Sequence, residues 1–287
     1  MDESNQIHCG DAVTVLSTFS PDSVALTVTS PPYYRHRDYG VDGQIGQEAT
    51  LADYLDRMES VFRELLRVTD EQGSCFVVVG DSYLDRRLQL VPHRLAILAA
   101  DVGWVVRNDV IWAKSDPPPD SPRNRWRAGH EHVLFLSKRA SGYRFYADAV
   151  RVPYAPATLR RWGAGQVYGG AKSKGRRRAS DSRMRHGQTF QLNPAGCVPT
   201  DVWKVPCSNT SAKHYAAFPD NLVQPIIEAC SAPGDVVLDP FAGTGTTCRV
   251  AASLGRLFVG IELNPEYAKL AVLGIERLDA ATTLAAA

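Results

Sequence analysis

The sequence has no long apolar run and almost no net charge, and each absence excludes a class of protein. Its 287 residues carry 32 Lys and Arg against 31 Asp and Glu, a formal net charge of +1. No global electrostatic field therefore draws the chain to nucleic acid or to a membrane, and any such attraction must come from a local patch. No apolar stretch approaches membrane-spanning length, and the acidic, polar N-terminus is unlike a signal peptide. The sequence thus predicts a cytoplasmic protein that does not enter a membrane.

The cysteines lack the spacing of a metal site or a disulfide framework. There are six, with no C-x-x-C pair among them. We therefore expect reduced thiols and no bound metal. They are Cys9, Cys75, Cys197, Cys207, Cys230 and Cys248.

Most of the chain shows an alternation of predicted strands and helices. Residues 24–29 form an apolar, β-branched run typical of a buried strand. Residues 51–66 have helical spacing behind a Thr50 N-cap, and Gly73 is expected to end that helix. Residues 74–81 are apolar on both faces, as in a parallel sheet. Further predictions are a helix at 88–100, strands at 104–112 and 132–137, a helix at 222–231, a strand at 235–239, a helix ending near 254, a strand at 256–261 and a helix from Pro265.

The first functional candidate is Ser30-Pro31-Pro32-Tyr33, directly after the predicted strand at 24–29. Consecutive prolines fix φ twice and remove two backbone donors, while their carbonyl oxygens remain acceptors. The turn therefore presents a hydroxyl, carbonyl oxygens and an aromatic ring, which suits a flat group with an NH2, such as a nucleobase. A Pro-Pro turn that merely ends a strand explains the tetrapeptide equally well. The polar loop that follows, residues 34–47, is long enough to be a mobile lid.

The middle of the chain is strongly basic. Residues 151–190 contain ten Lys and Arg against one acid, Asp181, with Gly, Ser and aromatic residues interleaved. One interpretation is a solvated, disordered loop. The other is a nucleic-acid contact, with cations on phosphates and aromatic rings available to bases.

A second functional candidate lies near the C-terminus. The predicted strand at 235–239 runs into a turn containing Gly243 and Gly245, and Glu262 ends the next predicted strand. This is the βαβ nucleotide-binding layout, in which the acid can accept hydrogen bonds from a ribose diol. The third glycine of the dinucleotide fingerprint is replaced by Cys248, and a Walker lysine is absent. The motif therefore favours an adenosyl cofactor without a pyrophosphate.

The two candidates together resemble a known family. Thr29-Ser30-Pro31-Pro32-Tyr33 and Asp239-Pro240-Phe241-Ala242-Gly243-Thr244-Gly245 look like the motifs of the S-adenosylmethionine-dependent amino-methyltransferases of DNA. The catalytic motif comes first, the basic segment second and the cofactor motif last, an order similar to the β group of bacterial restriction-modification systems. Other matching segments are Gly10-Asp11, Asp201-x-Trp203, His214-x-Ala216-x-Phe218-Pro219 and Gly260-Ile261-Glu262-Leu263-Asn264.

The resemblance implies a fold and a division of the chain. The fold would be the Rossmann-like α/β fold of S-adenosylmethionine-dependent methyltransferases, a mostly parallel sheet with helices on both faces and a permuted motif order. Residues 1–150 would form the catalytic half and 199–279 the cofactor-binding half. Residues 151–198 would be an inserted target-recognition region, and 280–287 a frayed tail.

The resemblance also implies roles for individual residues. Phe241, Gly243 and Gly245 would cradle the cofactor, Glu262 would bind its ribose and Asp11 its adenine amine. Phe218 could instead be ordinary core, Asp11 could be only a helix cap, and His214 is left outside the catalytic set as a structural hydrogen-bonder. The remaining cofactor contacts would be Ala12, Phe218, Pro219, Asp239, Thr244 and Asn264. The DNA contacts would be Arg160, Arg161, Lys172, Lys174, Arg176, Arg177 and Arg178.

The implied reaction is methyl transfer to an exocyclic amine of a flipped-out base in duplex DNA. Hydrogen bonds from the amine to Ser30 and to the Pro31 carbonyl would free its lone pair, and Tyr33 would stack on the base. In this family a Ser before Pro-Pro-Tyr goes mostly with cytosine and an Asp or Asn with adenine, so we expect cytosine N4. Adenine N6 and a non-catalytic DNA-binding relative remain alternatives, whereas ring-carbon methylation through Cys207 lacks the matching motif order.

Partners and location follow from the same resemblance. Double-stranded DNA would be the substrate, and a separate cognate restriction endonuclease is a possible partner, since the chain shows no nuclease motif. The protein would be a monomer or a homodimer in the cytoplasm, associated with the nucleoid.

Overall fold

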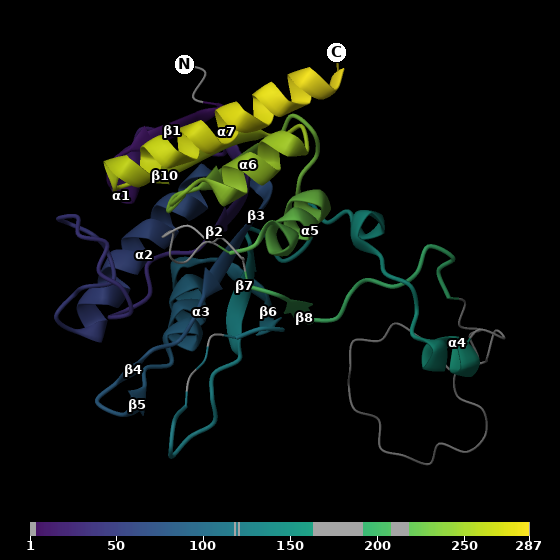
Figure 1. The fold of residues 1–287 in the computed structure, drawn as a ribbon, viewed down its shortest axis with the longest axis horizontal. Coiled ribbons are helices and arrows are strands. Elements are labelled where there is room, and N and C mark those ends of the chain that lie inside the picture. The colour runs from purple at the N-terminus through teal and green to yellow at the C-terminus, as the bar shows by residue number, and fades with distance from the viewer. Residues whose placement is uncertain (1–3, 118, 120, 163–191, 208–217, 287) are drawn as a thin grey trace. The chain divides into compact units, whose positions relative to one another are not determined.

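The structure is a computed structural model that describes residues 4–117, 119, 121–162, 192–207 and 218–286 (Figure 1). The chain divides into two compact units, one formed by Met1–Tyr146 with Thr200–Ala287 and the other by Ala147–Pro199. The insertion predicted from the sequence spans residues 151–198, and these bounds are similar to those of the second unit. No described helix is long and apolar enough to span a bilayer.

The larger unit is built on one sheet. Within the described residues its strand order is β1-β10-β9-β2-β3-β7-β6-β8. Neighbours from β1 to β3 are parallel, β7 is antiparallel to both β3 and β6, and β8 is parallel to β6. The predicted mostly parallel α/β sheet is confirmed. The strands are β1 Gln6–Cys9, β2 Val24–Thr29, β3 Thr69–Val79, β6 Val105–Lys114, β7 His130–Ser137, β8 Val202–Val205, β9 Val236–Asp239 and β10 Leu257–Glu262.

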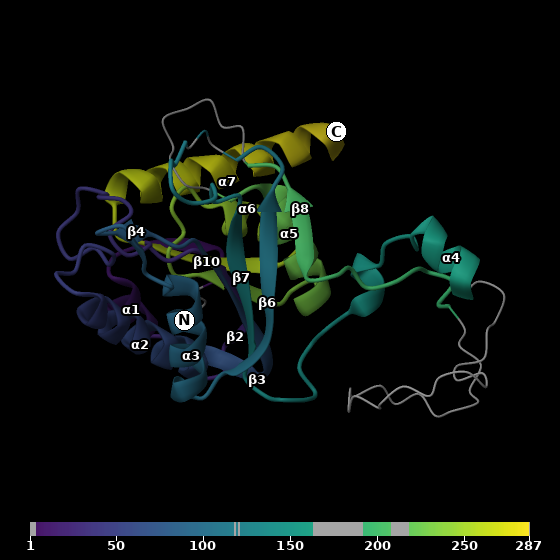
Figure 2. The same ribbon diagram turned by 90° about the horizontal axis from the view of Figure 1, so that it is seen from below.

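Helices cover both faces of this sheet (Figure 2). One layer contains α1 (Ala12–Leu16), α2 (Leu51–Val68) and α3 (Val91–Val102), which contact one another in sequence order. The other layer contains α5 (Asp220–Cys230), α6 (Thr246–Ser253) and α7 (Pro265–Ala286). Helix α7 extends through 280–286, which the sequence analysis had assigned to a frayed tail.

Local sequence signals explain several boundaries. Thr50 and Asp53 form the predicted capping box at the start of α2. The prediction that Gly73 ends this helix is wrong, because α2 stops at Val68 and Gly73 lies inside β3. The chain also contains a small hairpin that the sequence analysis missed, formed by β4 (Tyr83–Leu84) and β5 (Arg87–Leu88).

The smaller unit has a little regular structure of its own. It contains the 3-10 turn η1 (Ala147–Val150) and the helix α4 (Pro156–Trp162). Val152 and Cys197 form an isolated antiparallel bridge, and the Arg151 guanidinium donates to Asp148 (2.5 Å) and to the Gly196 carbonyl (2.9 Å). These contacts join the two ends of the insertion.

Candidate active site

The two sequence motifs meet in one cavity at the carboxyl edge of the sheet. Strands β1, β2, β9 and β10 are parallel, so the residues that follow them lie at the same edge. The cavity there has a volume of about 1080 Å³. Its lining includes Asp11, Ala12, Ser30, Pro31, Pro32, Tyr33, Phe218, Asp239, Phe241, Gly243, Thr244, Glu262 and Asn264, but neither Pro219 nor Gly245.

A direct hydrogen bond links the motifs. The Thr29 hydroxyl donates to Oδ1 of Asp239 over 2.7 Å, between residues 210 positions apart, and the Phe241 amide donates to the same oxygen (3.1 Å). Burial raises the pKa of Asp239 to about 6, although these hydrogen bonds oppose the rise. Asp239 therefore fixes the end of β9 to the end of β2, and it holds the two turns that follow these strands next to each other.

Ser30 belongs to a hydrogen-bond chain that ends on an ion pair. Its hydroxyl donates to Oη of Tyr33 (3.3 Å), and Tyr33 donates to Oε2 of Glu131 (2.9 Å). Lys114 pairs with the other oxygen of Glu131 over 2.5 Å. Burial, reinforced by the negative charge of Glu131, raises the pKa of Tyr33 well above its usual value, so the phenol stays protonated and donates. Because the Ser30 hydrogen points to Tyr33, the Ser30 oxygen is left as an acceptor.

The proline turn is held from behind. The Tyr54 hydroxyl, on α2, donates to the Pro32 carbonyl over 3.1 Å. Among the described residues, the Pro31 carbonyl receives no hydrogen bond, and Pro31 lines the cavity. The Pro31 oxygen is therefore without a donor among the described residues, and its predicted contact with a target amine remains a prediction.

The glycine turn and Glu262 form the other end of the cavity. Glu262 accepts from the Gly243 amide through Oε2 and from the Asn264 amide through Oε1, both over 2.8 Å. Burial raises the pKa of Glu262, while the amide donors oppose this effect. Gly243 has φ +53° and a Cβ there would meet nothing within 4 Å, whereas a Cβ on Gly245 would come within 2.9 Å of Ala271. Gly243 thus keeps the cavity open, and Gly245 allows α7 to pack closely.

Asp11 has a structural partner as well as a place in the cavity. Its Oδ1 accepts from the Thr14 amide and hydroxyl, both at 2.9 Å, and caps α1. Arg57 approaches its Oδ2 at 4.0 Å. Phe218 is buried at the cavity wall, and Pro219 is the N-cap residue of α5 rather than a lining residue. The predicted roles of these residues at the cofactor remain predictions.

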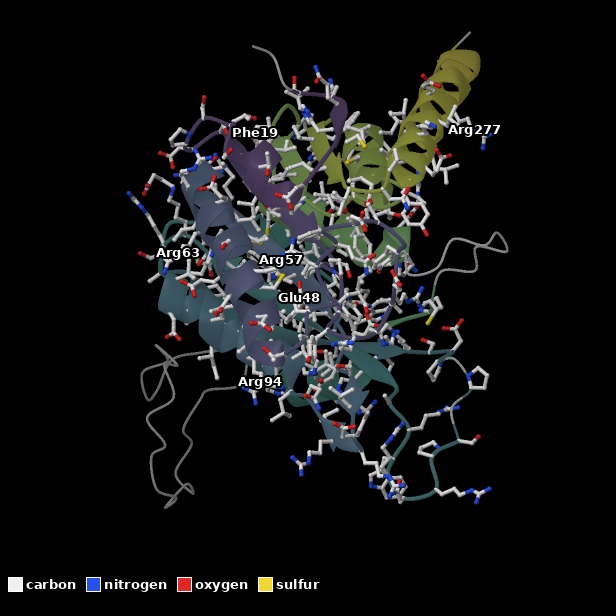
Figure 3. All side chains as sticks on the ribbon, turned by 90° about the vertical axis from the view of Figure 1, so that its left-hand side faces the viewer. Phe19, Glu48, Arg57, Arg63, Arg94 and Arg277 are labelled. Carbon is white, nitrogen blue, oxygen red and sulfur yellow. The ribbon has the colours of Figure 1, made fainter. Side chains whose placement is uncertain are left out.

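The loop at 34–47 is pinned to α2. Arg57 donates to the carbonyls of Gly43 (2.8 Å) and Gln44 (3.0 Å), and its guanidinium lies beside Glu48 at 3.3 Å (Figure 3). The Tyr39 amide donates to the side chain of Gln44. The loop is therefore a braced wall of the cavity in this structure, and the mobile lid that its length predicts remains a prediction.

The other predicted residues belong to the smaller unit or lie outside the described residues. Arg160 is exposed on α4 in the smaller unit, and Arg161 lies in the same helix. His214 and the basic residues Lys172, Lys174, Arg176, Arg177 and Arg178 lie outside the described residues. The predicted contacts of Arg160, Arg161 and the other basic residues with DNA remain predictions.

The sequence analysis missed Glu131 and Lys114. No local motif marks them, because they reach the cavity only through the sheet order: β7 is antiparallel to β3, so its first residues lie at the carboxyl edge of β3. Cys207 also lines the cavity, and burial raises the pKa of its thiol, which disfavours the thiolate that a nucleophile requires. Among the described residues, no cluster of His, Cys, Asp and Glu could hold a metal ion.

Comparison with known proteins agrees with this geometry. A family model described as DNA methylase (N6_N4_Mtase) matches residues 24–273. Type II methyltransferase M.XycI of Xanthomonas campestris pv. cyanopsidis is 33% identical over 91% of this chain and 84% of its own length. The DNA adenine methyltransferase YhdJ of Escherichia coli (strain K12) is 30% identical over 98% of this chain and 84% of its own length.

Solved structures share the fold. The Thermus thermophilus protein TTHA0409, in complex with S-adenosyl-L-methionine, has a TM-score of 0.63 at 27% identity, covering 95% of this chain and 93% of its own. The PvuII DNA methyltransferase (cytosine-N4-specific) has a TM-score of 0.68 at 20% identity, covering 96% of this chain and 89% of its own. These likenesses confirm the predicted methyltransferase fold.

Proposed function

Since the chain belongs to the N6_N4_Mtase family of DNA methylases, we propose that it transfers a methyl group from S-adenosylmethionine to the exocyclic N4 amine of a cytosine in duplex DNA. The family makes it a DNA methyltransferase. The choice of cytosine is our proposal, because the family acts on both N4 and N6 amines. One observation carries the proposal: the Thr29–Asp239 hydrogen bond brings Ser30 and the glycine turn into one cavity.

The cavity fits S-adenosylmethionine. Gly243 leaves open space beside the backbone, Phe241 supplies an apolar wall, and Glu262 keeps acceptor capacity for a ribose diol beyond its two amide donors. Phe218 and Asn264 complete this end. A volume of about 1080 Å³ exceeds the range of about 300–1,000 Å³ usual for a single small ligand, so a nucleobase has room beside the cofactor.

The chain's own residues prepare the amine for attack. A base's amino lone pair is delocalised into the ring, which makes it a weak nucleophile. The Ser30 oxygen and the Pro31 carbonyl are acceptors at one end of the cavity, and hydrogen bonds to them favour a pyramidal nitrogen with a free lone pair. The cofactor, when bound, supplies an electrophilic methyl group on a sulfonium. The nitrogen would form the new N–C bond as the S–CH3 bond breaks, which would leave a neutral thioether. The positively charged methylated amine would then release one proton to water.

Ser30 also supports cytosine over adenine. Its side chain is a short, neutral hydroxyl, oriented as an acceptor by Tyr33 and Glu131. A neutral hydroxyl in place of a carboxylate or amide lets a smaller pyrimidine ring approach the turn. Adenine N6 is the second candidate, and the identity to YhdJ favours keeping it.

Duplex DNA is the proposed substrate, and the inserted unit is the proposed target-recognition region. Its basic residues give it the charge to hold phosphates around a flipped nucleotide. The name of M.XycI, a type II methyltransferase, supports a restriction-modification context with a cognate endonuclease.

The test is identification of the modified nucleoside. Unmethylated genomic DNA is incubated with the protein and S-adenosylmethionine, digested, and analysed by mass spectrometry. We expect N4-methylcytosine. N6-methyladenine would move the assignment to the second candidate, and no modified nucleoside would favour the non-catalytic alternative.

A further inference from the structure

The larger unit carries a basic loop that methyl transfer itself does not use. Residues 121–129, the Arg-Trp loop, form the later part of the connection from β6 to β7. They contain three arginines and no acid, whereas the earlier part of the connection, 115–120, contains Asp116 and Asp120. Trp126 is 95% exposed. A tryptophan normally buries most of its large apolar ring, so a solvated one flanked by Arg125 and Arg127 indicates a binding surface.

The loop is held in place by the β4–β5 hairpin. The Arg125 guanidinium lies over the Tyr83 ring, 4.3 Å from its centroid, and Nη1 of Arg125 donates to the Trp126 carbonyl (3.2 Å). The hairpin itself closes through Asp85 and Arg86, with φ of 49° and 63°, as a tight two-residue turn requires. Arg125 thus has a bracing role, and it leaves Trp126 presented outward.

The loop lies at the same cavity as the catalytic turn. Arg125, Trp126 and Arg127 line it together with Ser30 and Tyr33. A target base reaches Ser30 only after it has left its duplex, which costs stacking energy. A segment that is both exposed and part of the cavity lining is therefore in a position to meet the duplex around the flipped nucleotide.

We propose that the Arg-Trp loop is a DNA-contacting element of the catalytic unit, distinct from the basic insertion. Trp126 stacks on the bases beside the nucleotide that leaves the helix, while Arg123 and Arg127 hold phosphates. Both arginines are exposed, and neither forms an ion pair within the described part of the chain. Every base offers a face for stacking, so this contact is independent of sequence.

Charge selects duplex DNA as the occupant. A second copy of this chain that docked through the same loop would bring the same three arginines to the contact, and like charges would repel. Duplex DNA instead offers phosphates that pair with the arginines and base faces that stack on the indole. The proposal rests on the proposed function only for the identity of the substrate as DNA.

The test is equilibrium binding to a short fluorescein-labelled DNA duplex at several KCl concentrations. Trp126→Ala should weaken binding roughly 5- to 150-fold, the worth of one stacked base, and Trp126→Phe should retain most of the affinity. Arg123→Gln with Arg127→Gln should lower the salt slope by about 0.9 for each phosphate that is no longer neutralised. Arg277→Gln, on α7 and outside the cavity lining (Figure 3), is the matched control and should change neither.

A second readout separates stacking from folding. DNA should quench tryptophan emission in the wild type, and Trp126→Phe should lose most of this quench while it still binds. Cofactor affinity measured by calorimetry should be unchanged in every variant, which shows that they fold. The proposal is overturned if the loop variants bind like Arg277→Gln and the quench survives in Trp126→Phe. Loop-dependent binding without any methylation by the wild type would instead refute the proposed function and leave this proposal standing.

Discussion

Ser30 illustrates how a single hydroxyl acquires a defined direction. A serine hydroxyl rotates freely unless a partner fixes it, and here the Tyr33 oxygen accepts its hydrogen. The oxygen of Ser30, which lines the cavity, then keeps its lone pairs for a donor on a ligand. Orientation of this kind is established in the folded protein before any substrate binds, and that is the basis of electrostatic preorganisation.

The Ser30→Ala variant tests this role. Removing one preorganised polar group from a reacting centre costs about 10²-fold in kcat, and we expect that loss with cofactor affinity unchanged. Ser60→Ala, on the exposed side of α2, is the matched control and should be fully active. A large loss of cofactor binding in Ser30→Ala would contradict the assignment.

Glu131 is expected to position Tyr33 and, through it, Ser30. In Glu131→Gln the phenol loses a charged acceptor, so kcat should fall roughly tenfold, about the worth of a charge-assisted hydrogen bond. The KM for DNA and the cofactor affinity should stay the same. Adding Tyr33→Phe to Glu131→Gln should lower kcat little further, because both changes break the same hydrogen-bond chain.

The control for this cycle is Glu64→Gln, whose carboxylate pairs with Arg67 on α2. It should leave turnover unchanged. Fully additive effects of Glu131→Gln and Tyr33→Phe would show that the two side chains act separately.

Asp239 should make stability depend on pH. Its pKa is raised from 3.8 to about 6 by burial, so the folded state holds its proton more tightly than the unfolded state. Between these two pH values the unfolded chain ionises first, and stability falls as pH rises, by about 3 kcal/mol in total. Asp239→Asn should abolish this component. Urea unfolding of both proteins across the range checks it, and parallel pH profiles would refute it.

At the scale of elements, the two glycines of the glycine turn have different structural roles. Both Gly243 and Gly245 have positive φ, so an alanine at either costs about 1–2 kcal/mol of strain. At Gly245 the new methyl would also press on Ala271 of α7, which adds about 1–3 kcal/mol of overpacking. We expect Gly245→Ala to lower the free energy of unfolding more than Gly243→Ala does.

The matched variant, Gly243→Ala, tests cofactor binding rather than helix packing. Gly243→Ala places its methyl in open space at the cavity, so it should weaken cofactor binding with a smaller effect on stability. Denaturation and calorimetry on the two variants measure both quantities. Equal destabilisation by both alanines would contradict the assigned packing role of Gly245.

Elements with strong local signals could be predicted from the sequence. Helix α2 carries its periodicity and its Thr50–Asp53 cap in consecutive residues, and β2 and β9 are apolar runs that end at special turns. The short β8 and the β4–β5 hairpin were missed, because two to four residues hold no period and pair only through their neighbours. Glu131 was missed because only the antiparallel direction of β7 brings it to Tyr33, and no local pattern in the sequence reveals that direction.

At the scale of the whole molecule, the net charge of +1 conceals a division of charge. The segment 151–190 is strongly basic, and the remainder of the chain is correspondingly acidic. A protein of this kind is held to DNA by particular surfaces rather than by its overall field. The inserted unit and the Arg-Trp loop are the two surfaces that we propose for this task.

Neutralising Arg176, Arg177 and Arg178 tests the inserted region. These residues lie outside the described part of the chain, and the prediction rests on sequence alone. Replacing all three with Gln should weaken DNA binding and lower the salt slope by about 0.9 for each phosphate left without its cation. An unchanged slope would return the triplet to the interpretation of a solvated loop.

The most direct test of the central claim is a crystal structure of the protein with a short DNA duplex and a non-reactive analogue of S-adenosylmethionine. We expect a cytosine turned out of the helix, with its N4 amine within hydrogen-bond distance of the Ser30 hydroxyl and the Pro31 carbonyl. The analogue should lie between Phe241 and Glu262, with its methyl position facing that amine. An analogue bound elsewhere, or a target amine far from Ser30, would contradict the account.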